Sequence, residues 1–294
     1  MTAAVSDGRV GPAPTGSSMD QVLKLVRYQF RDYLRSRRYV LMMTIVGAIG
    51  LILTAVVAYF RPDGVVNDPN GFYGTLWGGG AGAVIIFAGI IFGGDAIAGE
   101  FQNKTGYFLM GLPIRRSTIY VGKYLAALAA SFTALVVYLL ILFANGVYYL
   151  GGNAFPGAIA PAFLLAFVYL LALLGTTFLF SSLFKTSAYS ILVVAVLFLF
   201  VFSILETVLT DLVKIEPWML ISYASGAIGD VFAPSVNWGL TATVVTTHIP
   251  TAGGGMITNT TYTPGVAEGV VIMLVYFVAT SVLGLLLFER EEFT

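Results

Sequence analysis

The feature that most constrains this chain is a series of long apolar runs without a charged residue. Val40–Phe60 is the clearest of them, and it is long enough to cross the hydrocarbon core of a bilayer, which is about 30 Å thick. Apolar residues make up 58% of the 294 residues and charged residues 10%, whereas soluble domains hold about 45–50% and about 25%. The sequence therefore predicts an all-α polytopic membrane protein.

Six runs of this kind divide the chain. Because six spans return the chain to the side on which it started, both termini are expected on the same side of the membrane. Residues 39–294 are predicted to form one transmembrane domain, and residues 1–18, rich in Gly, Pro, Ser and Thr, a disordered tail. The predicted spans are residues 40–60, 76–94, 124–149, 161–184, 188–208 and 270–288.

Residues 19–38 predict an amphipathic helix that lies in the headgroup region of the membrane. Charged side chains recur there at three- and four-residue steps, with apolar side chains on the opposite face. A spanning run follows at once, which favours an interfacial helix over a solvated helix without membrane contact. The charged face holds Asp20, Lys24, Arg27, Arg31, Arg35 and Arg38, and the apolar face Val22, Val26, Phe30 and Tyr33.

The placement of Lys and Arg predicts how the spans are oriented. Of the 15 basic residues, only Arg61 and Lys214 fall on the side that holds residues 209–266. The others lie with the two termini and with residues 95–123. Since cytoplasmic segments carry the excess of positive charge, we expect a protein of the cell (plasma) membrane with both termini and residues 95–123 in the cytoplasm.

Residues 209–266, between spans five and six, form the longest hydrophilic segment and are expected outside the cell. Within them, Leu240–Thr263 is rich in Thr and Val on both sides of the turn Ala252–Gly253–Gly254–Gly255. Two β-prone runs that flank a glycine turn predict a small β-hairpin; the alternative is a plain surface loop.

Span two is rich in glycine at four-residue spacing. Small residues at this spacing allow two helix backbones to approach closely. The neighbouring backbone could belong to another span of the same chain or to a second copy across a dimer axis, and the sequence leaves both open. The glycines are Gly74, Gly78 and Gly82, followed by Gly89 and Gly93.

Several classes of chemistry are excluded by what the sequence lacks. There is no cysteine and only one histidine, His248, so thiolate chemistry and a multi-histidine metal site are excluded. The chain has no HExxH, GxSxG or GxxxxGK[ST] motif, so nucleotide phosphates cannot be bound by a P-loop. No span carries a charge near its centre. Asp95 and Glu206 lie at predicted span ends, where we expect water to reach them. Glu206 is either part of an outer gate or a solvated interfacial acid.

Residues 95–123 resemble the cytoplasmic loop between spans two and three of permeases in the type-2 membrane-protein family of ATP-binding-cassette (ABC) transporters. An acidic residue, a Thr next to a Gly, a Pro followed by Arg, and a Gly–Lys before span three carry the resemblance. The six-span plan with an amphipathic entry helix agrees with it. One departure is the order Lys104–Thr105–Gly106, where many relatives have Gly–Thr. The matching positions are Asp95, Glu100, Thr105, Gly106, Pro113, Arg116, Gly122 and Lys123.

The resemblance implies a permease that pairs with a second copy or a paralogue and binds two cytoplasmic ATPase subunits. ATP and Mg are then held by those subunits, with no cofactor in this chain. The family's loop contains a coupling helix that docks on the ATPase, and the ATPase-coupling positions carried over are Glu100, Thr105, Pro113 and Arg116, with Arg115 added by adjacency.

We therefore expect the permease subunit of an ABC exporter, itself not an enzyme, with the lipid bilayer as its surroundings and no nucleic-acid partner. The uncharged spans favour an apolar, amphipathic or lipid-linked cargo over small inorganic ions. The alternative is a membrane scaffold or sensor subunit whose outer segment, residues 209–266, binds a ligand or a protein. A passive channel is disfavoured because no span carries a polar stripe.

Overall fold

The computed structural model describes residues 18–103, 114–250 and 256–290. Within these ranges, six helical segments are long and apolar enough to cross a membrane. The all-α polytopic fold predicted from the sequence is therefore confirmed. The six segments are Arg37–Phe60, Pro69–Gln102, Arg116–Leu150, Ile159–Leu183, Ser187–Val213 and Val266–Arg290.

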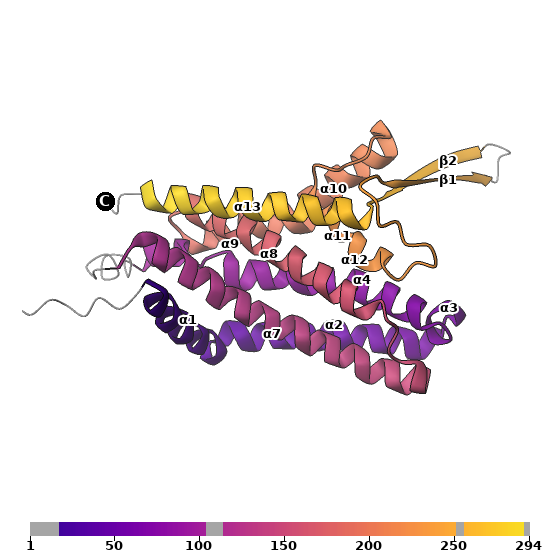
Figure 1. Ribbon diagram of the computed structural model, residues 1–294, viewed down its shortest axis with the longest axis horizontal. Helices are drawn as coiled ribbons and strands as arrows, with labels where there is room; N and C mark the ends of the chain where they lie inside the picture. The colour runs from indigo at the N-terminus through magenta and orange to yellow at the C-terminus, as the bar shows by residue number, and fades with distance from the viewer. Residues whose placement is uncertain (1–17, 104–113, 251–255, 291–294) are drawn as a thin grey trace, which may run out of the picture.

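The elements follow one another as a bundle of long helices with short helices and one hairpin at its ends (Figure 1). Spans two and five are not continuous α-helices, because each contains π-helical turns. The helices are α1 (Ser18–Arg35), α2 (Arg37–Phe60), α3 (Asp63–Val66), α4 (Pro69–Ala88), α5 (Ala98–Gln102), α7 (Arg116–Leu150), α8 (Ile159–Leu183), α9 (Ser187–Val196), α10 (Phe202–Thr207), α11 (Ile221–Ser225), α12 (Ala227–Asp230) and α13 (Val266–Arg290). The π-helical turns are Gly89–Gly93, Leu197–Val201 and Val208–Val213, and Gly151–Asn153 forms a 3₁₀ turn.

Span two begins earlier than the predicted residue 76, and local capping explains why. The Asp68 carboxylate accepts hydrogen bonds from the backbone N–H groups of Asn70 and Gly71, at 3.1 and 3.0 Å. Pro69 occupies the first turn, where its missing N–H costs nothing. Together they start α4 at Pro69 although the residues that follow are not strongly apolar.

Aromatic side chains of span two form the centre of the core. Trp77 is 1% exposed; its ring stacks on those of Tyr138 and Phe163 at centroid distances of 5.8 and 6.0 Å. The Tyr138 hydroxyl donates to the Leu76 carbonyl oxygen at 2.6 Å. Span two thus packs on α7 and α8, and it is surrounded by protein along most of its length.

The first described helix, α1, lies at the same end of the bundle as the C-terminal end of α13, whereas α3 and the hairpin lie at the other end (Figure 1). The predicted hairpin is confirmed: β1 (Thr243–Pro250) pairs antiparallel with β2 (Met256–Thr263). The turn that joins the strands lies outside the described residues.

Helix α1 is amphipathic, but the prediction that its apolar face meets the membrane needs correction. This face packs on the first turns of α7, where a Cβ added to Gly122 would lie 2.5 Å from Leu25 Cδ2, and Tyr33 is buried. A second apolar strip, with Met19, Leu23 and Leu34, is exposed next to the basic residues. That α1 lies in the headgroup region stays a prediction, and this strip is the face that would then meet lipid.

Candidate functional site

The helix of span two is interrupted near its C-terminal end, and polar contacts surround this break. After α4, the π-helical turn Gly89–Gly93 ends with the Gly94 N–H bonded to the Gly89 carbonyl oxygen at 3.0 Å. Residues 94–97 then form a turn that interrupts the regular helix, although Gly94 and Ile97 keep right-handed helical dihedral angles, and α5 begins at Ala98. Two consecutive glycines, Gly93 and Gly94, stand at this point. Glycine stabilises a helix less than alanine does, so interrupting the helix here costs little free energy.

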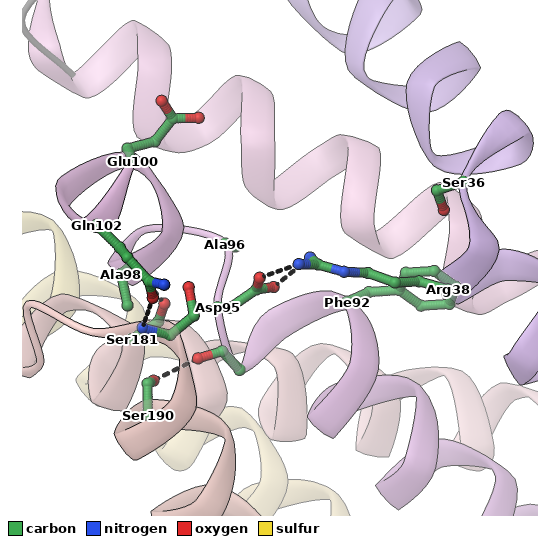
Figure 2. A network of polar contacts seen from close by, with 12 residues as sticks. Ser36, Arg38, Phe92, Asp95, Ala96, Ala98, Glu100, Gln102, Ser181 and Ser190 are labelled. Atoms are coloured by element: carbon green, nitrogen blue, oxygen red, sulfur yellow. Dashed lines mark hydrogen bonds and ion pairs between the residues drawn. The ribbon is translucent and has the colours of Figure 1, made fainter. Parts of the chain in front are cut away.

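Neighbouring spans bind the backbone groups that the break leaves unpaired (Figure 2). From α8, the Ser181 Oγ accepts the N–H groups of Ile97 and Ala98 at 2.9 and 3.0 Å. From α9, the Ser190 hydroxyl donates to the Gly94 carbonyl oxygen. At membrane depth an unpaired backbone group costs several kcal/mol, so these two serines make the break possible.

Two ion pairs flank the break. Asp95, only 4% exposed, is bound by the Arg38 guanidinium at 2.6 and 2.7 Å, and Figure 2 shows this side chain reaching the carboxylate from α2. The Lys123 ammonium, from α7, is 2.5 Å from Glu100 and donates to the Ala96 carbonyl oxygen at 3.2 Å. The expectation that water reaches Asp95 is therefore wrong: a cation from another helix takes the place of water.

Two further contacts complete the enclosure. The Tyr33 hydroxyl of α1 donates to the Phe92 carbonyl oxygen at 3.4 Å. Burial, reinforced by the nearby Asp95 carboxylate, raises the pKa of Tyr33 above its ordinary value, so the hydroxyl stays a neutral donor. On the other side, the Gln102 Oε1 accepts the N–H of Ser187 at 2.8 Å and joins α5 to the start of α9. We call this set of contacts the span-two junction.

The span-two junction binds five helices to one short segment. Residues 92–102 contact α1 through Tyr33, α2 through Arg38, α7 through Lys123, α8 through Ser181 and α9 through Ser190. A polar cavity of about 230 Å³ lies beside it, between α1 and α5. The charged groups here neutralise one another, and this arrangement is suited to mechanical connection rather than to acid–base catalysis.

The structure places the predicted coupling residues in different surroundings. Glu100 belongs to the junction, whereas the Arg116 guanidinium donates to the Glu289 carbonyl oxygen at 2.8 Å, at the C-terminal end of α13, where cations are favoured. Arg115 is exposed and directly precedes α7. Thr105 and Pro113 lie outside the described residues. The predicted loop 95–123 is shorter than expected, since α5 and α7 take up both of its ends.

The glycines of span two mostly serve packing within the chain. A Cβ at Gly89 or Gly93 would lie 2.1 Å from Leu173 Cδ2 or 2.0 Å from Thr177 Oγ1, both on α8. Gly82 differs, because an added Cβ there meets no described atom within 4 Å. Gly74 and Gly78 face Phe232 and Gly229 of the same chain. Of the two open alternatives, internal packing thus accounts for four of the five positions, and Gly82 is the one that it does not explain.

Sequence reasoning missed the partners that hold the junction together. Arg38 had been placed with the charged face of the N-terminal helix, and Ser181 and Ser190 were not singled out. A signal was present, since Ser181–Ser182 and Ser190 are small polar residues near the ends of apolar spans four and five. Polar residues in that setting seek backbone partners on other helices.

Glu206, the predicted gate residue, lies at the opposite end of span five, in α10. It is half-buried, and its carboxylate accepts a hydrogen bond from the Ser222 hydroxyl of α11 at 2.8 Å. This bond does not test the outer gate against the solvated interfacial acid, and both stay predictions. The position belongs to a second, separate polar region, which is described further below.

The six helices long and apolar enough to cross a membrane, all within the described residues, define a polytopic membrane protein. The family model described as ABC-2 family transporter protein matches residues 23–293, so the chain belongs to this family. A comparison with curated proteins finds no match for the chain. The family membership makes this protein a transmembrane permease of an ABC transporter.

Proposed function

We propose that this chain forms the translocation pathway of an ABC exporter as a dimer with a second copy or a paralogue. Separate ATPase subunits, which bind ATP and Mg, drive the dimer from the cytoplasmic side. The observation that carries the proposal is the span-two junction. It gives one short segment, next to residues 104–113, a direct connection to five helices.

The junction is suited to transmit force because its contacts are short and stiff. A displacement of α5 acts on α9 through Gln102, on α7 through Lys123 and on α8 through Ser181. Packed helices joined by such contacts move as rigid elements rather than deforming continuously. An ATPase that docks on the segment after α5 would therefore move several spans at once.

The proposed orientation follows from charge. The end of the bundle that carries the junction also carries the basic residues of α1 and the start of α7, whereas α3 and the hairpin at the other end hold few. By the positive-inside rule, the junction then faces the cytoplasm of a cell whose plasma membrane holds the protein. ATPase subunits are available only on that side.

A purification of the tagged full-length chain in mild detergent tests the assembly. We expect a P-loop ATPase to be recovered with it, and a second permease chain in the same complex. Recovery of the chain with no nucleotide-binding protein, at a yield at which the chain itself is intact and monodisperse, would overturn the proposal.

The coupling role needs a variant that leaves the fold intact. Glu100→Ala is unsuitable, because it leaves the buried Lys123 ammonium without its carboxylate partner and so destabilises the protein. Gln102→Ala removes only the contact between the exposed end of α5 and α9. In the reconstituted complex we expect it to lower transport per ATP hydrolysed, while its exposed neighbour variant Asn103→Ala does not. Equal coupling ratios in both variants would contradict this role.

The alternative, a non-transporting scaffold or sensor, is supported by a different observation: a polar pocket beneath the hairpin, formed by residues of span five and of the segment that follows it. A complex that binds ligand there, but shows no ATP-dependent movement of any cargo and no associated ATPase, would favour this function over transport.

A further inference from the structure

A polar cavity of about 570 Å³ lies at the hairpin end of the bundle, far along the chain from the span-two junction. Its walls come from span five, from the short helix α11 and from strand β2. The hairpin is fixed in this position, since the Tyr262 hydroxyl donates to the Lys214 carbonyl oxygen at 2.6 Å. We call this cavity the hairpin pocket.

The charged side chains that line the hairpin pocket are all acidic. Two carboxylates, Glu206 and Asp211, line it together with several hydroxyl groups, and no Lys or Arg belongs to its lining. Among the described residues neither carboxylate forms an ion pair. The hydroxyl-bearing residues are Ser203, Thr207, Thr210, Ser222, Ser225, Thr260, Thr261 and Tyr262. The lining therefore attracts a cation and repels an anion.

The Glu206 carboxylate is held in place rather than mobile. The Ser222 hydroxyl donates to one of its oxygens at 2.8 Å, and the residue is half-buried between span five and α11. No described residue donates a hydrogen bond to the second oxygen, which can therefore accept from a ligand. A fixed, partly desolvated carboxylate binds a charged donor more strongly than an exposed one does.

The pocket also has an apolar part. Ile86 of α4 and Phe198 of span five belong to the lining, and Phe198 is 5% exposed. A carboxylate, a ring of hydroxyls and two apolar side chains in one cavity match a molecule with an ammonium group at one end and a hydrocarbon or aromatic body at the other. The volume accommodates a molecule of that kind.

We infer that the hairpin pocket is a binding site for an organic amine in its ammonium form, with Glu206 as the main counter-ion and Asp211 as a weaker one. The ammonium group replaces water at the free Glu206 oxygen, and the apolar body lies toward Phe198. Neither the family membership nor the proposed coupling role assigns this site. It is independent of whether the chain transports its cargo outward.

Dansylcadaverine, a primary amine on an aromatic sulfonamide, is a suitable probe, and its N-acetyl derivative is the neutral control. Binding is measured by fluorescence with the full-length chain in nanodiscs of zwitterionic lipid, and the signal of empty nanodiscs is subtracted because such amines partition into lipid. We expect saturable binding of the amine and at least about tenfold weaker binding of the acetylated control, the effect of losing one hydrogen bond between charged groups.

Three variants locate the site. Glu206→Gln is expected to weaken amine binding about tenfold, and Asp211→Asn by about threefold because this carboxylate is exposed. Asp63→Asn, which removes an exposed acid from α3 at the same end of the bundle, is the matched control and should bind as the parent does.

The outcomes separate a true site from general attraction. Equal binding of the amine and its acetylated derivative, or equal loss in Glu206→Gln and Asp63→Asn, would overturn the inference. If Glu206→Gln unfolds at a lower temperature than the parent, Ser222→Ala decides. That change keeps the charge but releases the carboxylate, and we expect weaker amine binding with the neutral control unaffected. Unchanged binding in Ser222→Ala would then count against the site.

Discussion

Spans two and five differ in how much of them the protein itself covers. In the most apolar window of Pro69–Gln102, 72% of residues are buried, against 11% in that of Ser187–Val213. Both contain π-helical turns, which are common at functional sites, but only the turn in span two is followed by a break tied to its neighbours. The comparison separates a span fixed inside one chain from a span whose surface is left to lipid or to a partner.

The two spans also treat their acidic residues differently. Asp95 in span two has a cation from another helix within 2.6 Å, and the charge is cancelled inside the protein. In the part of the chain that the structure describes, the Glu206 carboxylate of span five is bound by the Ser222 hydroxyl alone, so its charge remains available to a ligand. The paired charge of Asp95 stabilises the fold, whereas the charge of Glu206 can bind a ligand. The predictions below test this distinction, from the largest expected effect to the smallest.

The largest effect is expected for Arg38→Met, which leaves Asp95 buried and unpaired. Removing one partner of a fully buried ion pair costs about 3–5 kcal/mol. Because Arg38 itself is 50% exposed, we expect a loss near the lower end of that range, about 3 kcal/mol. Thermal or denaturant unfolding of the detergent-solubilised chain measures this, and Arg37→Met, at the exposed neighbouring residue, is the control. Similar stabilities of the two variants would show that Asp95 does not depend on Arg38.

Gly93→Ala should destabilise span two by about 3 kcal/mol, because the new Cβ would overlap the stiff side chain of Thr177 and force α8 away. The matched change Gly82→Ala meets open space and should alter stability by less than about 0.5 kcal/mol. The same unfolding assay compares them. A large effect at Gly82 would instead indicate that a second copy packs on that position.

Ser181→Ala is expected to cost about 2 kcal/mol, since it leaves two backbone N–H groups at the break without their acceptor. Ser182→Ala provides the comparison: its hydroxyl only bonds the Phe178 carbonyl oxygen of its own helix, and its loss should cost little. Hydrogen exchange of Ile97 and Ala98 should rise in the first variant and not in the second.

The smallest effect is predicted for span five. Phe200 is 60% exposed, so Phe200→Ala should change the unfolding free energy of the isolated chain by less than about 0.5 kcal/mol. If a second permease chain covers this surface, the same change should weaken the dimer, which sedimentation or native mass spectrometry would detect. A strong loss of monomer stability would show that span five packs within its own chain.

The spans and the hairpin were predictable because their signals are local. Apolar length marks a span, and Thr- and Val-rich runs around glycines mark a hairpin, whatever the rest of the chain does. The junction was not predictable, because its partners lie far apart in sequence: Arg38 meets Asp95, and Ser181 meets Ile97. A charged residue at a span end is read as exposed to water unless its cation is known, which is why Asp95 was misplaced.

The bond between Tyr262 and the Lys214 carbonyl oxygen has a practical consequence for watching this protein work. Lys214 ends span five in a left-handed conformation, with φ 58°, and the hairpin is attached at that point. A displacement of span five must therefore carry the hairpin with it. A small fluorophore on the hairpin, or an antibody fragment bound to it, would therefore report movements of span five from outside the transmembrane bundle.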